Sequence, residues 1–508
     1  MASTPAWMHG PICWIYSLIM WAYSLLIGSL THVAFTSDKP QLTTSSIGPI
    51  LPEDGRPPES PLKHTCTSFA SAVTSRLGRG GVLAKAMYRG YFAAAALGQE
   101  FDLPPELAAS SAALAARVVG LTALMGELPL TFMNDALPPK AGCTEKYVLR
   151  CVGGEEIEMV AMPAPGGPDA GWSLCISSQV GCRMGCKFCE TGKMGLLRNL
   201  RVEEIVCQVA LAARSLQLRV ANVVFMGMGE PLDNVDAVIG AIRVITDPTG
   251  LNIPLSHVTV STSGVAQHVY TLLAALPSVR LAFSLHAAND ELRTRLMPIN
   301  SKVQLAELAK AMSTYLSKTK RRVTIQYVLL ADVNDSDAHA AELATFLATV
   351  GPLARLHVNL IPYNAQSGPA LFRAPDHEAC KAFKTSLQSL GLFTKIRVEK
   401  GAEKMAACGQ LGNVRLRREL NARRFAEASV ADEDQQHEQQ ARQPQPHGRR
   451  PQQGASAAQL EGEEPQEIAE EASQLAVAAA ATAQVQAAVD AERQTNASSL
   501  CGRKDLEW

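Results

Sequence analysis

The first 37 residues of the chain lack Asp, Glu, Lys and Arg altogether. Within this stretch, residues 12–30 are uncharged and mostly apolar, over about the length that spans a bilayer. The basic residues that precede the apolar core of a secretory signal are missing, and so is the Arg typical of a mitochondrial presequence. Residues 1–37 are therefore interpreted as an atypical targeting segment or membrane anchor. A wrongly defined amino terminus is the alternative.

The 508-residue chain also has almost no net charge, at −1, but its acidic and basic residues are unevenly distributed. Residues 427–508 hold 15 acidic and 6 basic residues, a charge of −9, which leaves +8 for residues 1–426. A mildly basic body suits a polyanion such as RNA without requiring one, because enzymes that never touch nucleic acid carry similar surpluses. The twelve cysteines are too few for a disulfide scaffold, and three fall within eight residues. That clustering favours metal ligation in a reducing, intracellular compartment.

Changes in composition divide the chain into segments. Residues 38–63 are rich in Pro, Ser and Gly, which is typical of a linker. Residues 64–140 contain helical stretches and predict a small, mainly helical accessory domain. Residues 425–508 are polar, rich in Ala, Glu and Gln and nearly free of aromatics, so burial cannot offset the entropy of ordering them, and we expect a disordered tail. The catalytic core is expected over residues 141–424.

Between Trp172 and Glu399, short apolar runs alternate with helical ones. Strands that recur at a spacing of about thirty residues, with helices between them, predict βαβ units and a parallel sheet or barrel of the α/β class. The runs are WSLCISSQ, NVVFMGMG, HVTVSTSG, RLAFSLHA, RVTIQYVLL, LHVNLIPYN and FTKIRVE. Four of them end in polar or glycine-rich tips, namely GMGEP, STSG, SLHA and PYN. Because active sites of such barrels lie at the carboxyl ends of the strands, the four tips predict one site.

Cys182, Cys186 and Cys189 follow the first of these strands in the pattern CRMGCKFC. Three thiolates on one loop can bind three irons of a 4Fe-4S cubane and leave the fourth iron without a protein ligand. That iron can chelate S-adenosylmethionine (SAM), so that an electron from the cluster cleaves the sulfonium to a deoxyadenosyl radical. A zinc site is the alternative, but structural zinc usually has a fourth Cys or His.

The segments around these cysteines resemble the RlmN/Cfr family of radical SAM RNA adenine methyltransferases. The resemblance covers roughly residues 145–415 and rests on seven motifs that occur in the family's order. The motifs are CISSQVGCRMGCKFCETGKMGLLRNL, VVFMGMGEPLDN, VTVSTSGV, FSLHAANDELRTRLMPIN, VTIQYVLLADVND, VNLIPYN and AACGQL. The resemblance implies a partial (β/α)6-type radical SAM barrel with a small amino-terminal helical accessory domain.

The resemblance also implies which residues bind SAM. Glycine lets the backbone approach a ligand, and polar strand tips supply donors and acceptors. Each residue taken alone is more typical of a turn at a strand end, whereas all of them together, on consecutive strands, favour a binding site. The matching positions are Gly229, Glu230, Ser261, Ser284, Leu285, His286 and Asn364.

Three further residues match the family's methyl-transfer apparatus. Cys408, in AACGQL, matches the cysteine that accepts a methyl group from a first SAM, while a second SAM yields the radical, so that each turnover uses two. Cys175 matches the resolving cysteine, whose thiolate attacks the sulfur of Cys408 and leaves a disulfide. Glu158 matches the general base that takes the proton from the methylated ring carbon. Without the motifs, a buried strand cysteine and a solvated carboxylate are the simpler interpretations.

The family implies carbon 2 of an adenine in large-subunit rRNA as the target, with tRNA left open as a second substrate. Carbon 8 of adenine, a radical SAM enzyme with a non-RNA substrate, and a non-catalytic iron–sulfur or RNA-binding protein remain alternatives. Lys400, Tyr363 and the ETGKMG segment depart from the residues that are frequent in the family. Because they border the site, they bear on the identity of the RNA target more than on the radical chemistry.

The expected partners follow from the resemblance, and the expected compartment follows from the amino-terminal segment and the long tail. An electron donor such as flavodoxin or ferredoxin is expected, and the chain is expected to be a monomer. The compartment is cytoplasmic or organellar, in a plastid or mitochondrion, and membrane contact through residues 12–30 is left open.

Overall fold

The computed structural model describes residues 60–96, 114, 117–118, 128–134, 136–140, 142–166, 170–365, 371–397 and 405–412. The predictions for residues 1–37 and 425–508 lie outside these ranges, as does nearly all of the linker at 38–63. Among the described residues, no helix is both long enough and apolar enough to cross a membrane. The domain boundaries at 37, 63, 140 and 424 stay predictions.

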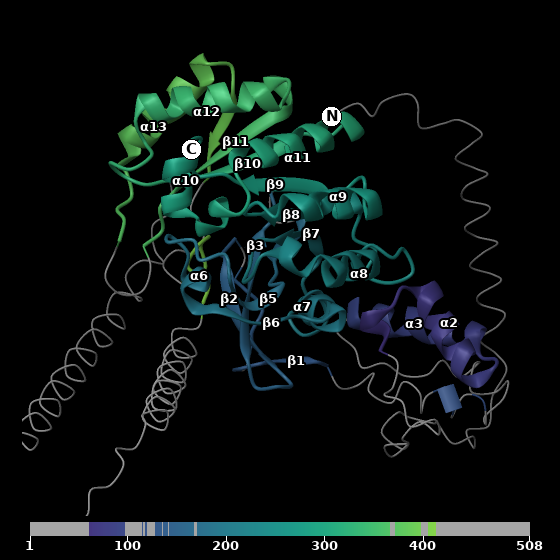
Figure 1. The fold of residues 1–508 in the computed structure, drawn as a ribbon. Coiled ribbons are helices and arrows are strands. Elements are labelled where there is room, and N and C mark those ends of the chain that lie inside the picture. Colours follow the sequence, from purple (N-terminus) through teal and green to yellow (C-terminus); the bar gives the residue numbers. More distant parts are fainter. Residues whose placement is uncertain are drawn as a thin grey trace, which may run out of the picture. The chain divides into compact units, whose positions relative to one another are not determined.

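A parallel sheet forms the centre of the fold (Figure 1), as the alternating pattern predicted. Each of the seven apolar runs contains one of its parallel strands, and neighbouring strands follow chain order. Strand interiors such as VTIQYVL are almost wholly buried, as expected for strands covered on both faces. The strands are β4 (Trp172–Cys175), β7 (Val220–Phe225), β8 (Val258–Thr262), β9 (Arg280–Ser284), β10 (Val323–Leu329), β11 (Leu356–Pro362) and β12 (Phe393–Ile396).

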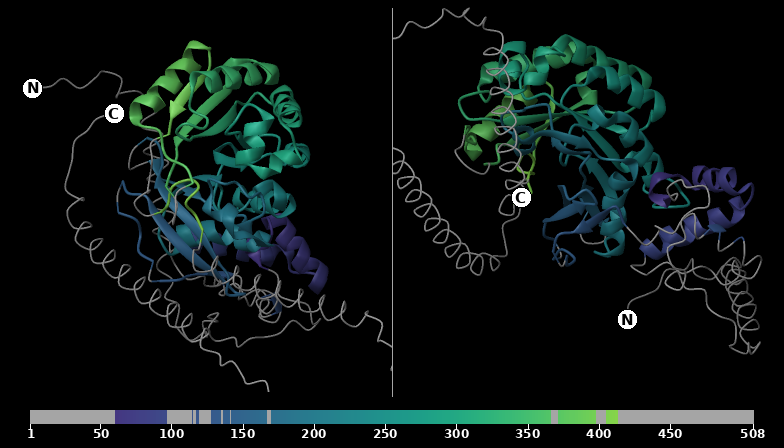
Figure 2. Two further views of the ribbon diagram at one scale, coloured as in Figure 1. Left: turned by 60° about the vertical axis from the view of Figure 1, so that its left-hand side comes forward. Right: turned by 60° about the horizontal axis from the view of Figure 1, so that its bottom comes forward.

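Helices connect these strands and lie on the outer side of the curved sheet (Figure 2). In α8, the buried residues Val238, Ile242 and Ile245 recur at helical spacing and turn one face to the core. Side-chain caps define the starts of two others, since Ser336 accepts from His339 N and Asp376 from Ala379 N. The helices are α7 (Val202–Arg214), α8 (Val235–Ile245), α9 (Ala266–Ala275), α10 (Asp290–Leu296), α11 (Leu305–Lys318), α12 (Asp337–Val350) and α13 (His377–Ser389). Short 3-10 turns, which link several of these elements, are η2 (Pro61–Lys63), η5 (Pro231–Asn234), η6 (Leu255–His257), η7 (Pro298–Ser301) and η8 (Leu353–Arg355).

An antiparallel extension continues the sheet beyond β4. Two antiparallel strands form it, β2 (Glu145–Cys151) and β3 (Glu156–Pro163), and β3 pairs with β4 so that Val160 faces Cys175. The sequence did not predict the three-residue strand β1 (Leu130–Phe132), which pairs with the far side of β2. This extension places Glu158 one strand away from the first parallel strand.

The described part of the accessory segment forms α2 (Cys66–Leu77) and α3 (Gly81–Ala96). Both helices pack on the barrel through the same continuous apolar core, and α3 lies against α7. A buried hydrogen bond from Cys66 N to Asp247 Oδ2, 2.7 Å long, ties the start of α2 to the end of α8.

The segment after β4 forms a hairpin where the sequence predicted a loop. β5 (Gln179–Cys182) pairs with β6 (Gly195–Asn199), and α6 (Glu190–Met194) lies between them. Gly181 adopts φ +75°, and a Cβ there would lie 1.9 Å from the carbonyl oxygen of Gly195. Only glycine allows the two strands to approach so closely. The hairpin is what places Cys182, the last residue of β5.

Candidate active site

A cavity of about 150 Å³ opens at the carboxyl ends of the parallel strands. Ten of the thirteen residues singled out in the sequence line it, so residues spread over more than 220 positions of the chain meet there. The ten are Cys182, Cys186, Cys189, Gly229, Glu230, Ser261, Ser284, His286, Asn364 and Cys408. Leu285, Cys175 and Glu158 lie outside this cavity.

The three clustered cysteines form one wall of this cavity. Cys182 and Cys186 are buried, whereas Cys189, the residue directly before α6, is partly exposed. Burial raises the pKa of all three thiols, so an electron-poor metal centre is what would favour their thiolate forms. Among the described residues, no three His, Cys, Asp or Glu side chains converge on a single metal ion. The ligands of a cubane each bind a different iron, and therefore surround a space rather than a point.

Asp233 holds the hairpin of β5 and β6 against the parallel sheet. Its carboxylate accepts from Arg183 Nε at 2.8 Å and from Gln179 Nε2 at 2.9 Å, and it forms an ion pair with the Arg183 guanidinium. Gln179 Oε1 in turn accepts from Glu230 N at 2.8 Å. One polar network thus fixes the cysteine segment to the tip of β7.

Gly229 packs closely against Gln179 of the hairpin; its predicted approach to SAM stays a prediction. Its φ of +100° falls in the left-handed region, and a Cβ would lie 2.6 Å from Gln179 Cβ and 2.8 Å from Gln179 N.

Gly229→Ala is expected to destabilise the chain by about 1–3 kcal/mol and to weaken SAM binding, because the strand tip must move. Thermal unfolding and calorimetric titration with SAM measure both effects. Gly154→Ala is the matched control, since Gly154 also has positive φ but no atom within 4 Å of the added Cβ. Equal SAM affinity in the two variants would contradict a role for Gly229 in shaping the cavity.

Glu230 joins the tips of two neighbouring strands. Its Oε2 accepts from both N and Oγ of Ser263, each at 2.7 Å, and its Oε1 accepts from Leu232 N at 3.0 Å. Burial raises the pKa of this carboxyl group, whereas the bonds from Ser263 act in the opposite direction. The carboxylate therefore positions the polar tips of β7 and β8 around the cavity.

His286 faces the cavity as a neutral ring. It adopts φ +61°, and its Nδ1 accepts from Val328 N at 2.9 Å. Burial lowers the pKa of His286 to about 3, so Nε2 carries the single ring proton at neutral pH. The ring of Phe188, one residue before Cys189, packs edge-on against it at 4.7 Å between centroids. Leu285 is fully buried and does not line the cavity, while its backbone N donates to Gln326 O at 3.0 Å.

The low pKa of His286 predicts a pH-dependent stability. Below about pH 6.5 the unfolded chain binds a proton at this residue that the folded chain does not bind until about pH 3. Between these pH values folding stability falls as pH falls, by about 1.4 kcal/mol per unit from this group. His286→Asn should therefore lose about 2 kcal/mol less than the unsubstituted chain between pH 6.5 and 5. Urea unfolding at both pH values tests this, and parallel losses in the two chains would refute it.

Cys408 lies on the short segment 405–412, which hydrogen bonds fix to the barrel. Asn364 Nδ2 donates to Cys408 O at 3.0 Å, and Glu190 N donates to Gly409 O at 2.8 Å. Gly412 N donates to Glu158 Oε2 at 2.8 Å. The predicted residues Asn364 and Glu158 thus both hold the segment that presents Cys408.

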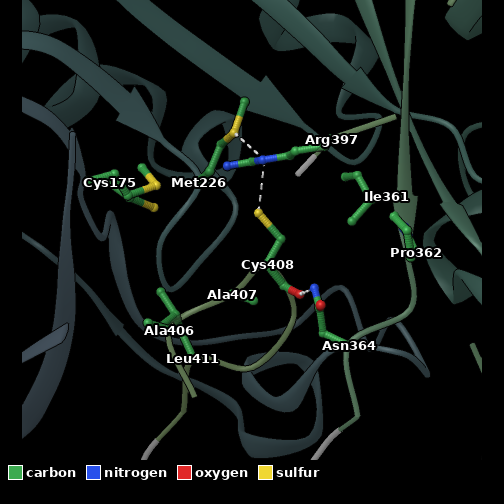
Figure 3. A pocket seen from close by; sticks show the side chains of 11 residues that line it. Cys175, Met226, Ile361, Pro362, Asn364, Arg397, Ala406, Ala407, Cys408 and Leu411 are labelled. Carbon is green, nitrogen blue, oxygen red and sulfur yellow. Dashed lines mark hydrogen bonds between the residues drawn. The ribbon is translucent and has the colours of Figure 1, made fainter. Parts of the chain in front are cut away.

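A second, smaller cavity of about 30 Å³ adjoins the first (Figure 3). Cys175 lines only this smaller cavity, whereas Cys408, Asn364 and Arg397 line both. Burial and, to a smaller extent, nearby Cys408 raise the pKa of Cys175 to about 12, although Arg397 acts in the opposite direction. Cys408 thus lies at the boundary between a space lined by the three clustered thiols and a space lined by Cys175.

Glu158 lines neither cavity. Its side chain is buried, and Oε1 forms an ion pair with Lys146 Nζ at 3.0 Å while Oε2 accepts from Gly412 N. In this arrangement both carboxylate oxygens are engaged.

Three further residues line the larger cavity although no sequence motif singled them out: Ser263, Gln326 and Arg397. Gln326 interrupts the apolar run of β10, and within the described chain its buried Oε1 has no hydrogen-bond partner. A polar residue in an otherwise apolar strand was the available signal. Arg397 directly follows β12, where a fifth polar tip could have been sought.

Comparisons with known proteins agree with this geometry. Residues 176–344 match the radical SAM superfamily. The probable dual-specificity RNA methyltransferase RlmN 1 of Protochlamydia amoebophila is 41% identical over 363 residues, which cover 71% of this chain and 96% of that protein. The chain belongs to the RlmN/Cfr family. The dual-specificity RNA methyltransferase RlmN of Syntrophobacter fumaroxidans is 43% identical over 270 residues, 53% of this chain and 76% of that protein. A crystal structure of a radical SAM methyltransferase from Sphaerobacter thermophilus has a TM-score of 0.61 and 36% identity, and the match covers 70% of this chain and 99% of that one.

Membership of the RlmN/Cfr family makes a 4Fe-4S cluster and SAM the cofactors of this chain. The donor set fits them. Three thiols line one cavity together with Gly229 and with Gln326, whose Oε1 has no hydrogen-bond partner among the described residues. Cys182, Cys186 and Cys189 would hold the cluster, and the polar strand tips would hold SAM.

Proposed function

We propose that this protein is a radical SAM methyltransferase that methylates carbon 2 of an adenine in large-subunit rRNA, with tRNA as a second substrate. The main support for this proposal is the position of Cys408, which lines both the cavity of the clustered thiols and the cavity of Cys175. A thiol that receives a methyl group on one side and is resolved on the other needs access to both. The names of the RlmN relatives support RNA as the substrate class.

When bound, the cluster and SAM supply the methyl group and the radical chemistry that activates it. The chain's own part is to hold that group on the Cys408 sulfur and to release it after it has joined the adenine ring. A direct transfer from SAM is disfavoured because carbon 2 of adenine is electron-poor and does not attack a sulfonium methyl.

Release of the product uses Cys175. Its thiolate attacks the Cys408 sulfur, so that an S–S bond forms while the bond from that sulfur to the methylene carbon breaks. The electron pair of the broken bond stays with the carbon, which becomes the new methyl group as it gains a proton. The two thiols are oxidised to a disulfide, which an external reductant must return to thiols before the next turnover.

Glu158 is proposed as the base that removes the proton from the methylated ring carbon. Its carboxylate reaches the Cys408 segment through Gly412 N but does not line either cavity. A base role requires the carboxylate to exchange its contact with Gly412 for the ring carbon, so segment 405–412 must shift when RNA binds. Loss of a general base typically costs ~10²–10⁴-fold in rate.

Product analysis tests this proposal. The reconstituted protein is incubated with SAM, rRNA or tRNA, and a one-electron donor such as flavodoxin or ferredoxin, and nuclease digests are analysed by mass spectrometry. The expected product is 2-methyladenosine. Finding 8-methyladenosine would overturn the assigned carbon. Deoxyadenosine formed without any methylated RNA would indicate a non-RNA substrate, and absence of deoxyadenosine would contradict catalysis by a radical route.

A further inference from the structure

One cation at the boundary of the two cavities has no part in the function proposed above. Arg397 follows β12, and its backbone N donates to Leu360 O at 2.7 Å, which continues the pairing with β11. The guanidinium is partly buried and lines both cavities. A cationic side chain held at a fixed place inside a site acts on whatever polar atoms it faces.

The polar atoms that the Arg397 guanidinium faces are sulfurs. Arg397 Nη1 donates to Cys408 Sγ at 3.1 Å and lies 4.0 Å from Met226 Sδ (Figure 3). No described carboxylate pairs with Arg397, and the charges that raise its pKa are those of Cys408 first and Cys175 second. Buried or half-buried arginines usually face carboxylates, so this one is set apart by its partners.

We propose that Arg397 is a positioning residue for both sulfur steps of the reaction. Its guanidinium holds the Cys408 sulfur at the boundary of the two cavities, and its charge stabilises the Cys175 thiolate that later attacks that sulfur. This inference rests on the proposed function, because it assigns Arg397 to the methyl-carrying and resolving thiols.

In the first step, the Cys408 sulfur attacks the methyl carbon of SAM. An S–C bond forms on Cys408, the bond from the sulfonium to that methyl breaks, and the electron pair remains on the departing thioether sulfur. The thiol proton passes to solvent. A nitrogen donor at 3.1 Å directs the sulfur and stabilises negative charge that develops on it.

In the second step, Arg397 counteracts the burial of Cys175. Burial and the nearby Cys408 both raise the pKa of Cys175, and Arg397 is the charged group that lowers it. The flanking strands place Val160 and Val224 beside Cys175, and neither residue titrates. Removal of Arg397 therefore leaves the Cys175 thiolate without its compensating cation.

The first test follows methylation of Cys408 with neither RNA nor reductant present. The reconstituted protein receives SAM with a trideuterated methyl group, which separates new methyl groups from those added during expression, and peptides are analysed by mass spectrometry over time. Arg397→Met should slow methylation roughly 10- to 100-fold, the range for a lost hydrogen bond to a charged group. Arg397→Lys, which keeps the charge, should restore part of the rate. Lys395→Met removes an exposed cation from the same strand, lines neither cavity, and should match the unsubstituted protein.

The second test follows release of RNA from the enzyme–RNA adduct in single turnovers at several pH values, on denaturing gels. Arg397→Met should move the pH dependence of release upward, because a Cys175 with a higher pKa needs a higher pH to ionise. Arg397→Lys should move it less.

Rates of Cys408 methylation that are equal in Arg397→Met and Lys395→Met would overturn the inference. So would a defect confined to RNA affinity, which would make Arg397 an RNA contact. If Arg397→Met fails to fold, the Arg397→Lys variant decides, since an unchanged methylation rate and pH profile would also count against it. A complete absence of methyl groups on Cys408 in the unsubstituted protein would instead refute the proposed function.

Discussion

Cys408→Ala is expected to abolish RNA methylation, with a loss of ~10⁴-fold or more, the scale on which removal of a nucleophile acts. The carrier sulfur is lost while the cysteines and strand tips of the larger cavity stay in place. Reductive cleavage of SAM to deoxyadenosine should therefore continue. Mass spectrometry of the RNA and chromatography of the small molecules measure the two outcomes.

Cys380→Ala is the control for Cys408→Ala. Cys380 is a buried free thiol on α13 and lines neither cavity, so its removal should leave methylation unchanged apart from a modest loss of stability. If Cys408→Ala still methylated RNA at an appreciable rate, the methyl group would have to travel by another route.

Cys175→Ala should stop the reaction one step later. The methylene group still reaches the adenine ring, but no thiol attacks the Cys408 sulfur, so the protein remains covalently bound to RNA. We expect nearly one adduct per active chain and loss of multiple turnover. A denaturing gel shows the adduct as a band that nuclease digestion removes.

Cys151→Ala provides the comparison for Cys175→Ala. Cys151 is also a buried strand cysteine, located on β2, and it lines neither cavity. The Cys151→Ala variant should show normal turnover without a protein–RNA adduct. The double variant Cys175→Ala/Cys408→Ala should form no adduct either, since Cys408 provides the bond. An adduct that persisted in the double variant would show that another residue bonds to RNA.

The parallel core was predictable because its strands are apolar, short and separated by helices. The run VTIQYVLL became β10 for that reason, and its pairing with its neighbours follows chain order. The hairpin of β5 and β6 was not predictable in the same way. It depends on the approach of Gly181 to Gly195, which involves backbone contact and leaves no apolar pattern in the sequence.

The sequence motifs predicted which residues form the candidate site. They did not predict how these residues divide between the two cavities. The motifs named Cys408 and Cys175, whereas the structure shows that Cys408 lines both cavities and Cys175 one. Arg397 was missed because its strand, FTKIRVE, alternates polar and apolar residues, so one more cation attracts no notice. Its contact with Cys408 depends on where segment 405–412 lies beside Asn364 and Glu158, which the sequence pattern does not encode.

In the proposed function, the cysteines of the site divide into three that bind the cluster and two that carry and release a methyl group. The most direct test is a single turnover in which Cys408 carries a trideuterated methyl group and all added SAM is unlabelled. We expect the first methylated adenine to contain deuterium. An unlabelled first product, with the label still on Cys408, would contradict this division of the cysteines.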